Sequence, residues 1–511
     1  MNSLLKRSFC FLCICLISFN VFAGPWLLPG NLSVKSDIDL LADAGLIKAP
    51  VMTWPIAWVN IGPELLSPET KAKLPKEPEY VQQAYQRIVA LYEQSYQPYK
   101  AQTAAYAAGS NRLNPFRTFQ YEPYADFASG VSAAYQSKHA AGSINVSYYD
   151  APHKSYSNPV HLDNSYAYLL LGNWAIGFDQ FNRWWGPGYS DSLILSTNAP
   201  PLPTFTIQRL RALAPTIKWL HWLGPWSLTS SLAVLGDPRP QPNTLAWNTD
   251  FSFRPTNGLQ FDIARVSLLS GSNRPLNGKM LWNLLTLQGA GACDPPHSTS
   301  YCHNYAPGKE HFEITVRGNL YSRWKVPLNL FLQTIFNDNI PYSHYPVMSH
   351  LPLPAKTAFL AGASTWKQIH IGLLRLYAEY EYTFENDYWF WGWRQDGIYE
   401  DEGYPYTYGG RILGSSLGNE AIGYTLGAIL NEVSGNSDTF NLRYLELNAD
   451  NQTGYTYSFK RQNVIWASFG RTIVLLHHLG SLTPELGYLI SLSNNALSSG
   501  FSATITWSKN F

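Results

Sequence analysis

The feature that most constrains this chain is an alternation of apolar and polar residues that continues through most of its length. Leu245, Trp247 and Phe251, for example, alternate with Asn248 and Asp250. This period of two recurs up to the end of the chain and predicts antiparallel strands with one apolar and one polar face. No apolar run after residue 23 reaches the roughly 18 residues that a membrane helix needs.

Two architectures can carry such strands: a soluble β-sandwich with one wet face, or a membrane barrel with one lipid face. A sandwich would divide into domains of about 100–200 residues, yet about 400 residues of alternation contain no linker. Only 14% of the residues are charged, and 33 Tyr, 24 Phe and 18 Trp are present. The aromatic residues recur near predicted strand ends, where membrane barrels carry aromatic girdles. These features favour an all-β transmembrane barrel.

The last strand, which runs to Phe511, predicts how the barrel closes. An open edge would leave backbone groups unpaired in lipid, so we expect this strand to pair with the first one, near residues 116–127. At about 22 residues per strand and connection, the barrel has about 18 strands. Export places both termini in the periplasm, which makes the number even.

Connection lengths predict which end of the barrel faces outward, because outer loops are longer than periplasmic turns. The tight turns lie at Gly172–Asn173, Gly224–Pro225 and Thr256–Gly258. The long stretches that should face outward are 182–205, 270–309, 337–356 and 385–420.

The N-terminal part predicts export and a helical segment ahead of the barrel. A basic start, an apolar run and a small-residue cleavage site before Gly24 indicate a signal peptide. The following residues have helical periodicity, with Ser36 as an expected N-cap and a stop at Gly45. We therefore divide the chain into a signal peptide (1–23), a periplasmic α-helical cap or plug (24–112) and an outer-membrane β-barrel (113–511).

Two cysteines remain after the signal peptide. Cys293 and Cys302 lie in a Gly/Pro/Ser-rich stretch of an exported chain, which favours one disulfide. A metal site with His297 and His303 is the alternative. We expect no metal and no cofactor. The balance of 36 basic and 35 acidic residues argues against nucleic acid as a partner.

Several segments, in the same order, resemble the Wzi-type outer-membrane capsule-assembly proteins. The most distinctive is RWWGPGYSDSLILS at 183–196, and PWLLPGNL, LLADAG, TWPIAW, LGPW, SFRPTNGL and GYPYTYGGRILG are similar as well. Ser415 stands where we expect His. The resemblance covers essentially the whole mature chain and implies an 18-stranded barrel whose lumen is blocked by a periplasmic helical cap and by inward-folded loops. It also implies a lectin-like, non-enzymatic role in binding and organising capsular or other surface polysaccharide.

Two aromatic segments are candidates for contacting the polysaccharide, because indoles stack on sugar faces and Arg pairs with uronate carboxylates. The candidates are Trp389, Trp391, Trp393, Arg394, Asp396 and Tyr404 in one segment and Arg183, Trp184 and Trp185 in the other. For the first segment the alternative is an aromatic girdle. For the second we favour the structural alternative, in which the Trp pair packs a loop inside the lumen and Arg183 pairs with Asp179.

Two other functions compete with polysaccharide binding. Arg375, Glu379, Glu381 and Glu385 form a lumenal row that a porin-like or gated channel could use as a filter, although such residues are more often paired wall charges. A barrel enzyme acting on lipid or glycan could use Ser416 in GSSLG, but the strand–turn–helix context and an oriented His are missing. We expect no enzymatic activity.

The expected location is the outer membrane of a Gram-negative bacterium. Outer-membrane lipid would surround the barrel. A terminal aromatic residue, here Phe511, resembles the feature that outer-membrane barrels present to their assembly machinery.

Overall fold

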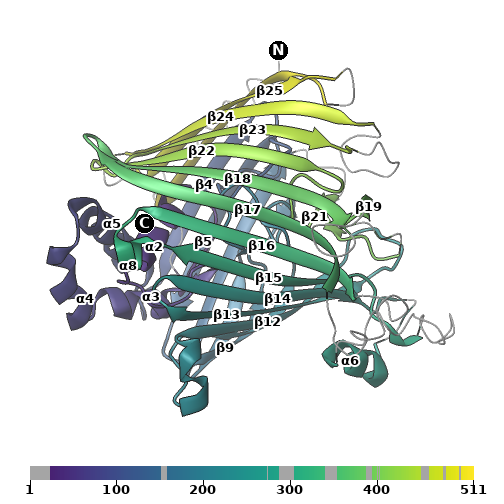
Figure 1. Ribbon diagram of the computed structural model, residues 1–511, viewed down its shortest axis with the longest axis horizontal. Helices are drawn as coiled ribbons and strands as arrows, with labels where there is room; N and C mark the ends of the chain where they lie inside the picture. The colour runs from purple at the N-terminus through teal and green to yellow at the C-terminus, as the bar shows by residue number, and fades with distance from the viewer. Residues whose placement is uncertain are drawn as a thin grey trace.

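A closed antiparallel β-barrel surrounds an interior filled by the N-terminal segment and by loops that fold inward (Figure 1). The computed structural model describes residues 24–150, 158–272, 274, 276–286, 304–339, 354–386, 394–399, 401, 403–449, 460–475, 479–493 and 497–511.

The strands of the barrel follow one another in chain order. They are β4 (Gln102–Ser110), β5 (Phe127–Gln136), β6 (Ala140–Asp150), β7 (Val160–His161), β8 (Tyr166–Leu171), β9 (Trp174–Asp179), β11 (Thr204–Arg209), β12 (Trp226–Leu235), β13 (Thr244–Thr256), β14 (Leu259–Leu269), β15 (Glu310–Asn319), β16 (Leu328–Asn339), β17 (Pro354–Ile369), β18 (Gly372–Asn386), β19 (Arg394–Gly397), β22 (Ile422–Glu432), β23 (Ser437–Leu447), β24 (Gln462–Val474), β25 (Ser481–Ser491) and β26 (Gly500–Asn510).

The remaining elements are short strand pairs and helices. The pairs are β1 (Trp26–Leu27) with β3 (Ile56–Ala57), β2 (Thr53–Trp54) with β10 (Trp184–Trp185), and β20 (Thr407–Tyr408) with β21 (Arg411–Ile412). The helices are α2 (Leu32–Asp43), α3 (Trp58–Leu65), α4 (Pro68–Lys73), η2 (Leu74–Lys76), α5 (Glu79–Ser95), η3 (Lys218–Leu223), α6 (Gly278–Leu285) and α8 (Tyr321–Trp324). Within the described ranges, no helix is both long and apolar enough to cross a membrane.

The strand number confirms the sequence prediction. β6 pairs directly with β8, and β18 pairs directly with β22. The short strands β7 and β19 therefore do not count as separate strands of the barrel wall. Counted without these two, the described residues form an 18-stranded barrel.

The closing pair differs from the sequence prediction. β26 pairs with β4, in a register that sets Thr506 opposite Ala108, and not with a strand near 116–127. The first barrel strand therefore begins at Gln102, inside the segment that the sequence assigned to the helical cap. Residues 116–127 instead lead into β5 and turn inward, where Phe116 and Phe119 are fully buried.

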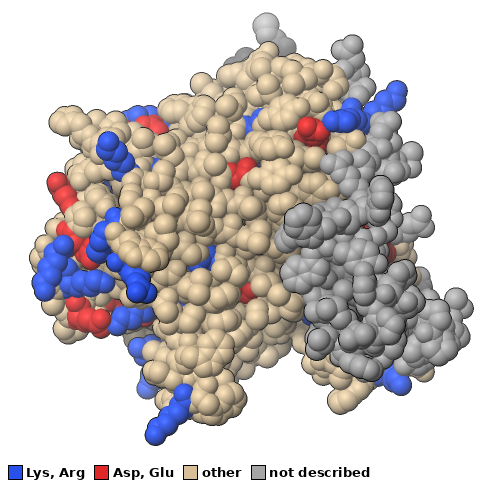
Figure 2. All heavy atoms as spheres, in the orientation of Figure 1, with Lys and Arg blue, Asp and Glu red and all other residues tan. Residues whose placement is uncertain are grey.

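Alternation gives the barrel an apolar outer surface and a polar inner one. On β13, Asn248 and Asp250 are buried on the lumenal side, whereas Leu245 and Trp247 lie on the outer side. Large apolar side chains such as Ile144 and Phe178 are about two-thirds exposed on the outer wall, at 65% and 66%. Figure 2 shows charged atoms gathered around the helices, while the wall facing the viewer carries few. Such a wall suits a lipid environment.

The two ends of the barrel differ. Tight turns such as Gly172–Asn173 lie at the end that carries α3, α4 and α5, where the C-terminus also lies (Figure 1). The described parts of the long connections 180–203, 270–309 and 394–421 lie at the opposite end, which we call the loop end. This division matches the predicted turns and the described parts of the predicted loops, whereas most of the predicted loop 337–356 lies outside the described residues.

Helix α2 begins earlier than predicted. Its N-cap is Asn31, whose side chain accepts a hydrogen bond from the Val34 N–H at 3.0 Å. Ser36 lies inside the helix and does not cap it. Its hydroxyl accepts a hydrogen bond from Arg375 of the barrel wall. The helix ends before Gly45, which has a positive φ of 68° as a C-terminal glycine requires.

Candidate functional site

Among the described residues, several segments fold into the lumen, and we call four of them the plug: helix α2 and the connections 111–126, 180–203 and 398–421. Each segment is attached to lumenal side chains of the wall, so the plug and its attachments decide what the barrel can pass or bind.

Helix α2 is held by pairs between its acidic residues and basic or amide residues of the wall. Arg317 of β15 lies 2.8 Å from Asp43, which also accepts a hydrogen bond from Asn329 of β16 at 2.7 Å. Arg254 of β13 donates to the Ala42 carbonyl at 2.6 Å and so satisfies the C-terminal end of the helix. The wall thus binds both the side chains and the free carbonyls of α2.

The segment that contains Arg183, Trp184 and Trp185 has the structural role favoured from the sequence. Arg183 donates to Asp179 at 2.8 Å. Trp184 and Trp185 form β10, which pairs with β2 of the N-terminal segment, and their side chains are 0% and 1% exposed. Because these indoles are packed inside the lumen, neither presents a face to the outside.

Asp191 joins three parts of the molecule. It accepts hydrogen bonds from the Ser416 N–H at 3.0 Å and the Ser416 hydroxyl at 2.5 Å, and it lies 3.4 Å from Arg443 of β23. Arg443 in turn lies 3.8 Å from Glu381 of β18, which accepts from the Ser415 hydroxyl. This cluster ties connection 180–203 and connection 398–421 to the wall. Ser415, the residue that stands where we expected His, is part of this cluster.

The residues of the lumenal row are buried and bonded to the plug or to neighbouring wall residues, so the row does not line an open path. Glu379 accepts from the backbone N–H groups of Tyr189 and Ser190, at 2.6 and 3.0 Å. Arg375 donates to Ser36 of α2 at 2.8 Å. Glu385 accepts from Asn337 and lies 3.9 Å from Lys309. Each of these charges, with Glu381, is at most 5% exposed.

Ser416 has none of the context of a catalytic nucleophile. Its side chain is fully buried and donates to Asp191. The segment follows the short strand β21 and precedes barrel strand β22, so the strand–turn–helix arrangement of a nucleophile elbow is missing.

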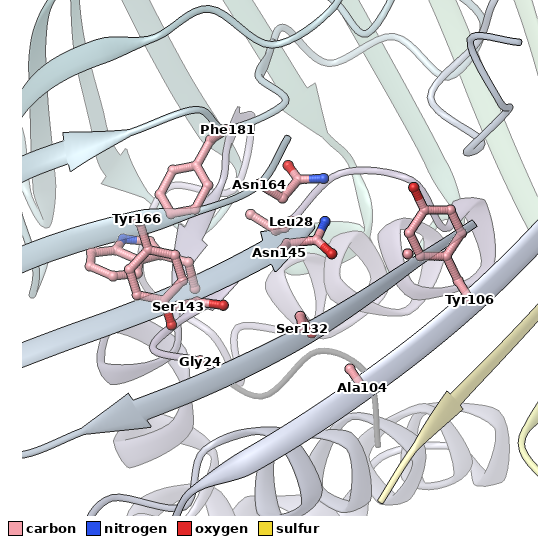
Figure 3. Close-up of a pocket in the computed structure, with 12 residues that line it drawn as sticks. Gly24, Leu28, Ala104, Tyr106, Ser132, Ser143, Asn145, Asn164, Tyr166 and Phe181 are labelled. Carbon is pink, nitrogen blue, oxygen red and sulfur yellow. The ribbon is translucent and has the colours of Figure 1, made fainter. Parts of the chain in front are cut away.

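The cavities found between the described parts of the plug and the wall are small. Figure 3 shows the cavity nearest the helical end, where Tyr166 and Phe181 lie on one side and Tyr106 on the other. Its volume is about 30 Å³, and two further cavities that Phe181 also lines measure about 20 and 10 Å³. By this measure one water molecule needs about 10–15 Å³. These cavities therefore accommodate a few waters and no sugar ring.

At the loop end the plug rises into the β20–β21 hairpin. Its turn contains Gly409 and Gly410, both with positive φ, as a tight hairpin turn requires. Tyr406 is buried and donates to the Ile194 carbonyl at 2.7 Å, whereas Tyr408 and Arg411 are only half-buried. Burial raises the pKa of Tyr408 to about 12.

The remaining predicted contact residues divide into two groups. Tyr404 is 6% exposed and donates to the Ser270 carbonyl at 3.1 Å, so it is part of the packing below the hairpin. Trp389, Trp391 and Trp393 lie outside the described residues, and of Arg394 and Asp396 only the backbone, in β19, is described. Cys293, Cys302, His297 and His303 also lie outside, and the described part of the chain contains no cluster that could hold a metal.

Comparison with known proteins identifies the family. The model of the family described as capsule assembly protein Wzi matches residues 95–475. The chain belongs to the Wzi family. A relative from Klebsiella pneumoniae, an uncharacterized 55.8 kDa protein in the cps region, is 24% identical over 335 residues. The match covers 64% of this chain and 60% of the relative, so this chain spans less than two-thirds of that relative's length.

A solved structure shares the fold of this Wzi-family chain. It is Wzi of Escherichia coli, an outer membrane protein involved in group 1 capsule assembly and described as a carbohydrate-binding β-barrel. The two structures match with a TM-score of 0.77 and 20% identity, over 95% of this chain and 99% of the other. The chain is thus an outer-membrane-type barrel of this family.

Sequence reasoning missed the residues that attach the plug. Asp191, Arg443 and Arg317 were not singled out, although Arg254 and Arg317 lie at lumenal positions of predicted strands. An Arg on the polar face of a barrel strand is therefore the pattern that could have indicated a plug contact.

Proposed function

We propose that this Wzi-family barrel binds capsular or other surface polysaccharide at its loop end and organises it there without chemical conversion. The observation that carries the proposal is the filled lumen. A glycan cannot pass cavities of about 30 Å³ or less, so the outer rim is the surface that remains for it. Family membership and the carbohydrate binding of the E. coli barrel with the same fold support the same reading.

The rim that we assign combines the aromatic segment that contains Trp389, Trp391 and Trp393 with the β20–β21 hairpin. Trp389, Trp391 and Trp393 follow β18 in the chain, and β18 is the wall strand that carries Glu379 and Glu381. Tyr408 and Arg411 lie on the hairpin, where Arg411 donates to Asn198 at 3.1 Å. Aromatic faces and guanidinium groups are suited to sugar rings and uronate carboxylates.

The orientation follows from the same proposal. We infer that the helical end faces the periplasm with both termini, because tight turns cluster there and long loops at the other end. Residues 24–96 then form a periplasmic cap, residues 1–23 a cleaved signal peptide, and Cys293 and Cys302 a disulfide on the outer side. Phe511, whose N–H donates to Thr103 at 3.4 Å beside the closing strand pair, is the contact for the assembly machinery.

The test is binding of purified, detergent-solubilised barrel to the host's own surface polysaccharide. Saturable binding by the wild type should weaken at least tenfold when Trp389, Trp391 and Trp393 are replaced together by Ala. Stacking of a nucleic-acid base on an aromatic side chain contributes about 1–3 kcal/mol to binding. If a sugar ring stacked on an indole contributes a similar amount, the loss of one such contact is measurable.

A matched control is Trp219→Ala. Trp219 lies in η3 at the helical end and is 74% exposed, so its loss should leave polysaccharide binding unchanged. Equal weakening by this variant would indicate a non-specific contact. No saturable binding by the wild type would refute the proposal, and ion conductance of the wild type in planar bilayers would then favour a channel.

A further inference from the structure

Helix α6 lies on the outside of the barrel, at the loop end, apart from the other described helices (Figure 1). Asn277 caps it by accepting a hydrogen bond from the Met280 N–H at 2.9 Å. Met280 and Leu284 pack against Leu269, with Leu245 and Trp247 beside them. Leu245, Trp247 and Leu269 belong to the outer face of β13 and β14, so α6 covers wall positions that would otherwise face lipid.

The same helix carries a second apolar strip, which is exposed. Leu281 and Leu285 lie one turn apart and share a face, and Trp282 lies beside them. These side chains are 37%, 64% and 62% exposed. The exposed strip borders directly on the strip that packs on the wall, because residues 280, 281, 284 and 285 are consecutive around the helix. Lys279 and Asn283 lie on the remaining side.

Polar contacts fix this orientation. Arg265, on the outer face of β14, donates to the Leu284 carbonyl at the C-terminal end of α6 and to Glu310 at 2.6 Å. Asn283 donates to the Tyr305 carbonyl at 3.1 Å, and Asn277 donates to the Asn304 carbonyl at 2.8 Å. The helix is therefore held at a defined rotation, with Trp282 pointing away from its attachments.

We propose that α6 is an interfacial anchor that inserts Leu281, Trp282 and Leu285 among the lipids of the outer leaflet. Lipid is the occupant because the strip continues the lipid-facing wall. Val234 of β12, which is 40% exposed on that wall, pairs in register with Leu245, against which α6 packs. An indole at the upper edge of the apolar band is the arrangement that membrane interfaces favour.

The anchor would also hold the rim of the barrel at a fixed height. The segment that α6 binds, 304–309, accepts a hydrogen bond at the Ala306 carbonyl from Arg274, which also donates to Tyr404 at 3.3 Å. Tyr404 leads into the β20–β21 hairpin. A helix seated in the leaflet is thereby connected through described contacts to the hairpin at the loop end.

The test uses the full chain in liposomes of phosphatidylcholine with brominated or ordinary acyl chains. The difference in emission between wild type and Trp282→Phe reports Trp282 alone. We expect brominated chains to quench this difference at least twofold and aqueous iodide to have a smaller effect. Iodide quenching that equals or exceeds the bromolipid effect would overturn the proposal. The assay contains no polysaccharide, so its result is independent of the proposed function.

Two controls separate insertion from a folding defect. Trp184→Phe, measured in the same way, should report an indole that neither quencher reaches, because Trp184 is 0% exposed inside the lumen. Leu285→Glu places a charge in the inserted strip and should increase iodide quenching of Trp282, whereas Lys279→Glu on the polar side should not. Equal behaviour of these two charge variants would count against insertion. Heat-modifiable gel mobility confirms that each barrel is folded.

Discussion

Arg443 is the residue on which the lumenal cluster depends most. Its guanidinium is fully buried and lies 3.4 Å from Asp191 and 3.8 Å from Glu381. Replacing it by Met would leave two carboxylates buried without their cation. Removing one partner of a buried pair costs about 3–5 kcal/mol, so we expect Arg443→Met to lower the unfolding temperature clearly, measured as loss of heat-modifiable mobility.

The same chain offers a control for this prediction. Arg471 also bridges two carboxylates, Glu432 and Asp438, at 2.8 and 3.0 Å, but its side chain is 38% exposed. Exposed pairs contribute about 0–1 kcal/mol, so Arg471→Met should hardly change the unfolding temperature. Equal effects of the two substitutions would show that burial of the cluster contributes nothing beyond an ordinary surface pair.

At the scale of residues, sequence reasoning singled out some lumenal residues, such as Arg183 and Arg375, but not the distant residues that pair across the lumen. The predicted pairing of Arg183 with Asp179 joins residues that are only four positions apart in the chain. Asp191 and Arg443 are separated by 252 positions, and no local pattern relates them. Ser36 was misassigned as an N-cap because its true partner, Arg375, lies 339 positions away.

At the scale of elements, a strand could be predicted only where the side chains on its two faces differ clearly in polarity. β13 alternates large apolar and polar side chains, so its two faces were evident from the sequence. β4 reads QTAAYAAGS, and Ala on both faces removes the contrast from which a period of two is recognised. Its β-propensity is also low. The closing strand was therefore sought in the more aromatic segment that follows, which instead turns into the lumen.

The β10–β2 pair links the N-terminal segment to connection 180–203, and Trp184 is its centre. The indole is 0% exposed and packs edge-on against Phe119 at 5.3 Å between ring centroids. Phe or Trp to Ala in a core costs about 3–5 kcal/mol. We expect Trp184→Ala to loosen both segments together, detected as faster proteolysis of the plug in the folded barrel. Trp219→Ala, at an exposed site, should not change the cleavage pattern.

At the scale of the whole molecule, the barrel and its contents have separate origins of stability. An 18-stranded wall closes on itself through backbone hydrogen bonds from β4 to β26, and natural barrels of about 16–18 strands can keep an open aqueous lumen. Here the lumen is filled from both ends by segments that contact each other, through β10 and β2 and through the hydrogen bond from Tyr189 to Asp39 at 2.9 Å.

This arrangement predicts how conductance depends on the N-terminal segment. The wild type should give almost no ion current in planar bilayers, because the described cavities are of water size. A variant that lacks residues 25–96 but keeps the barrel from β4 onward loses α2 and the β2 partner of β10, so connection 180–203 loses its support. We expect this variant to conduct with fluctuating current steps. Replacing residues 183–196 by a short Gly-Ser linker in addition should make the current larger and steadier. If the wild type conducts as well as either variant, the plug does not close the barrel, and a channel function becomes the better account of the molecule.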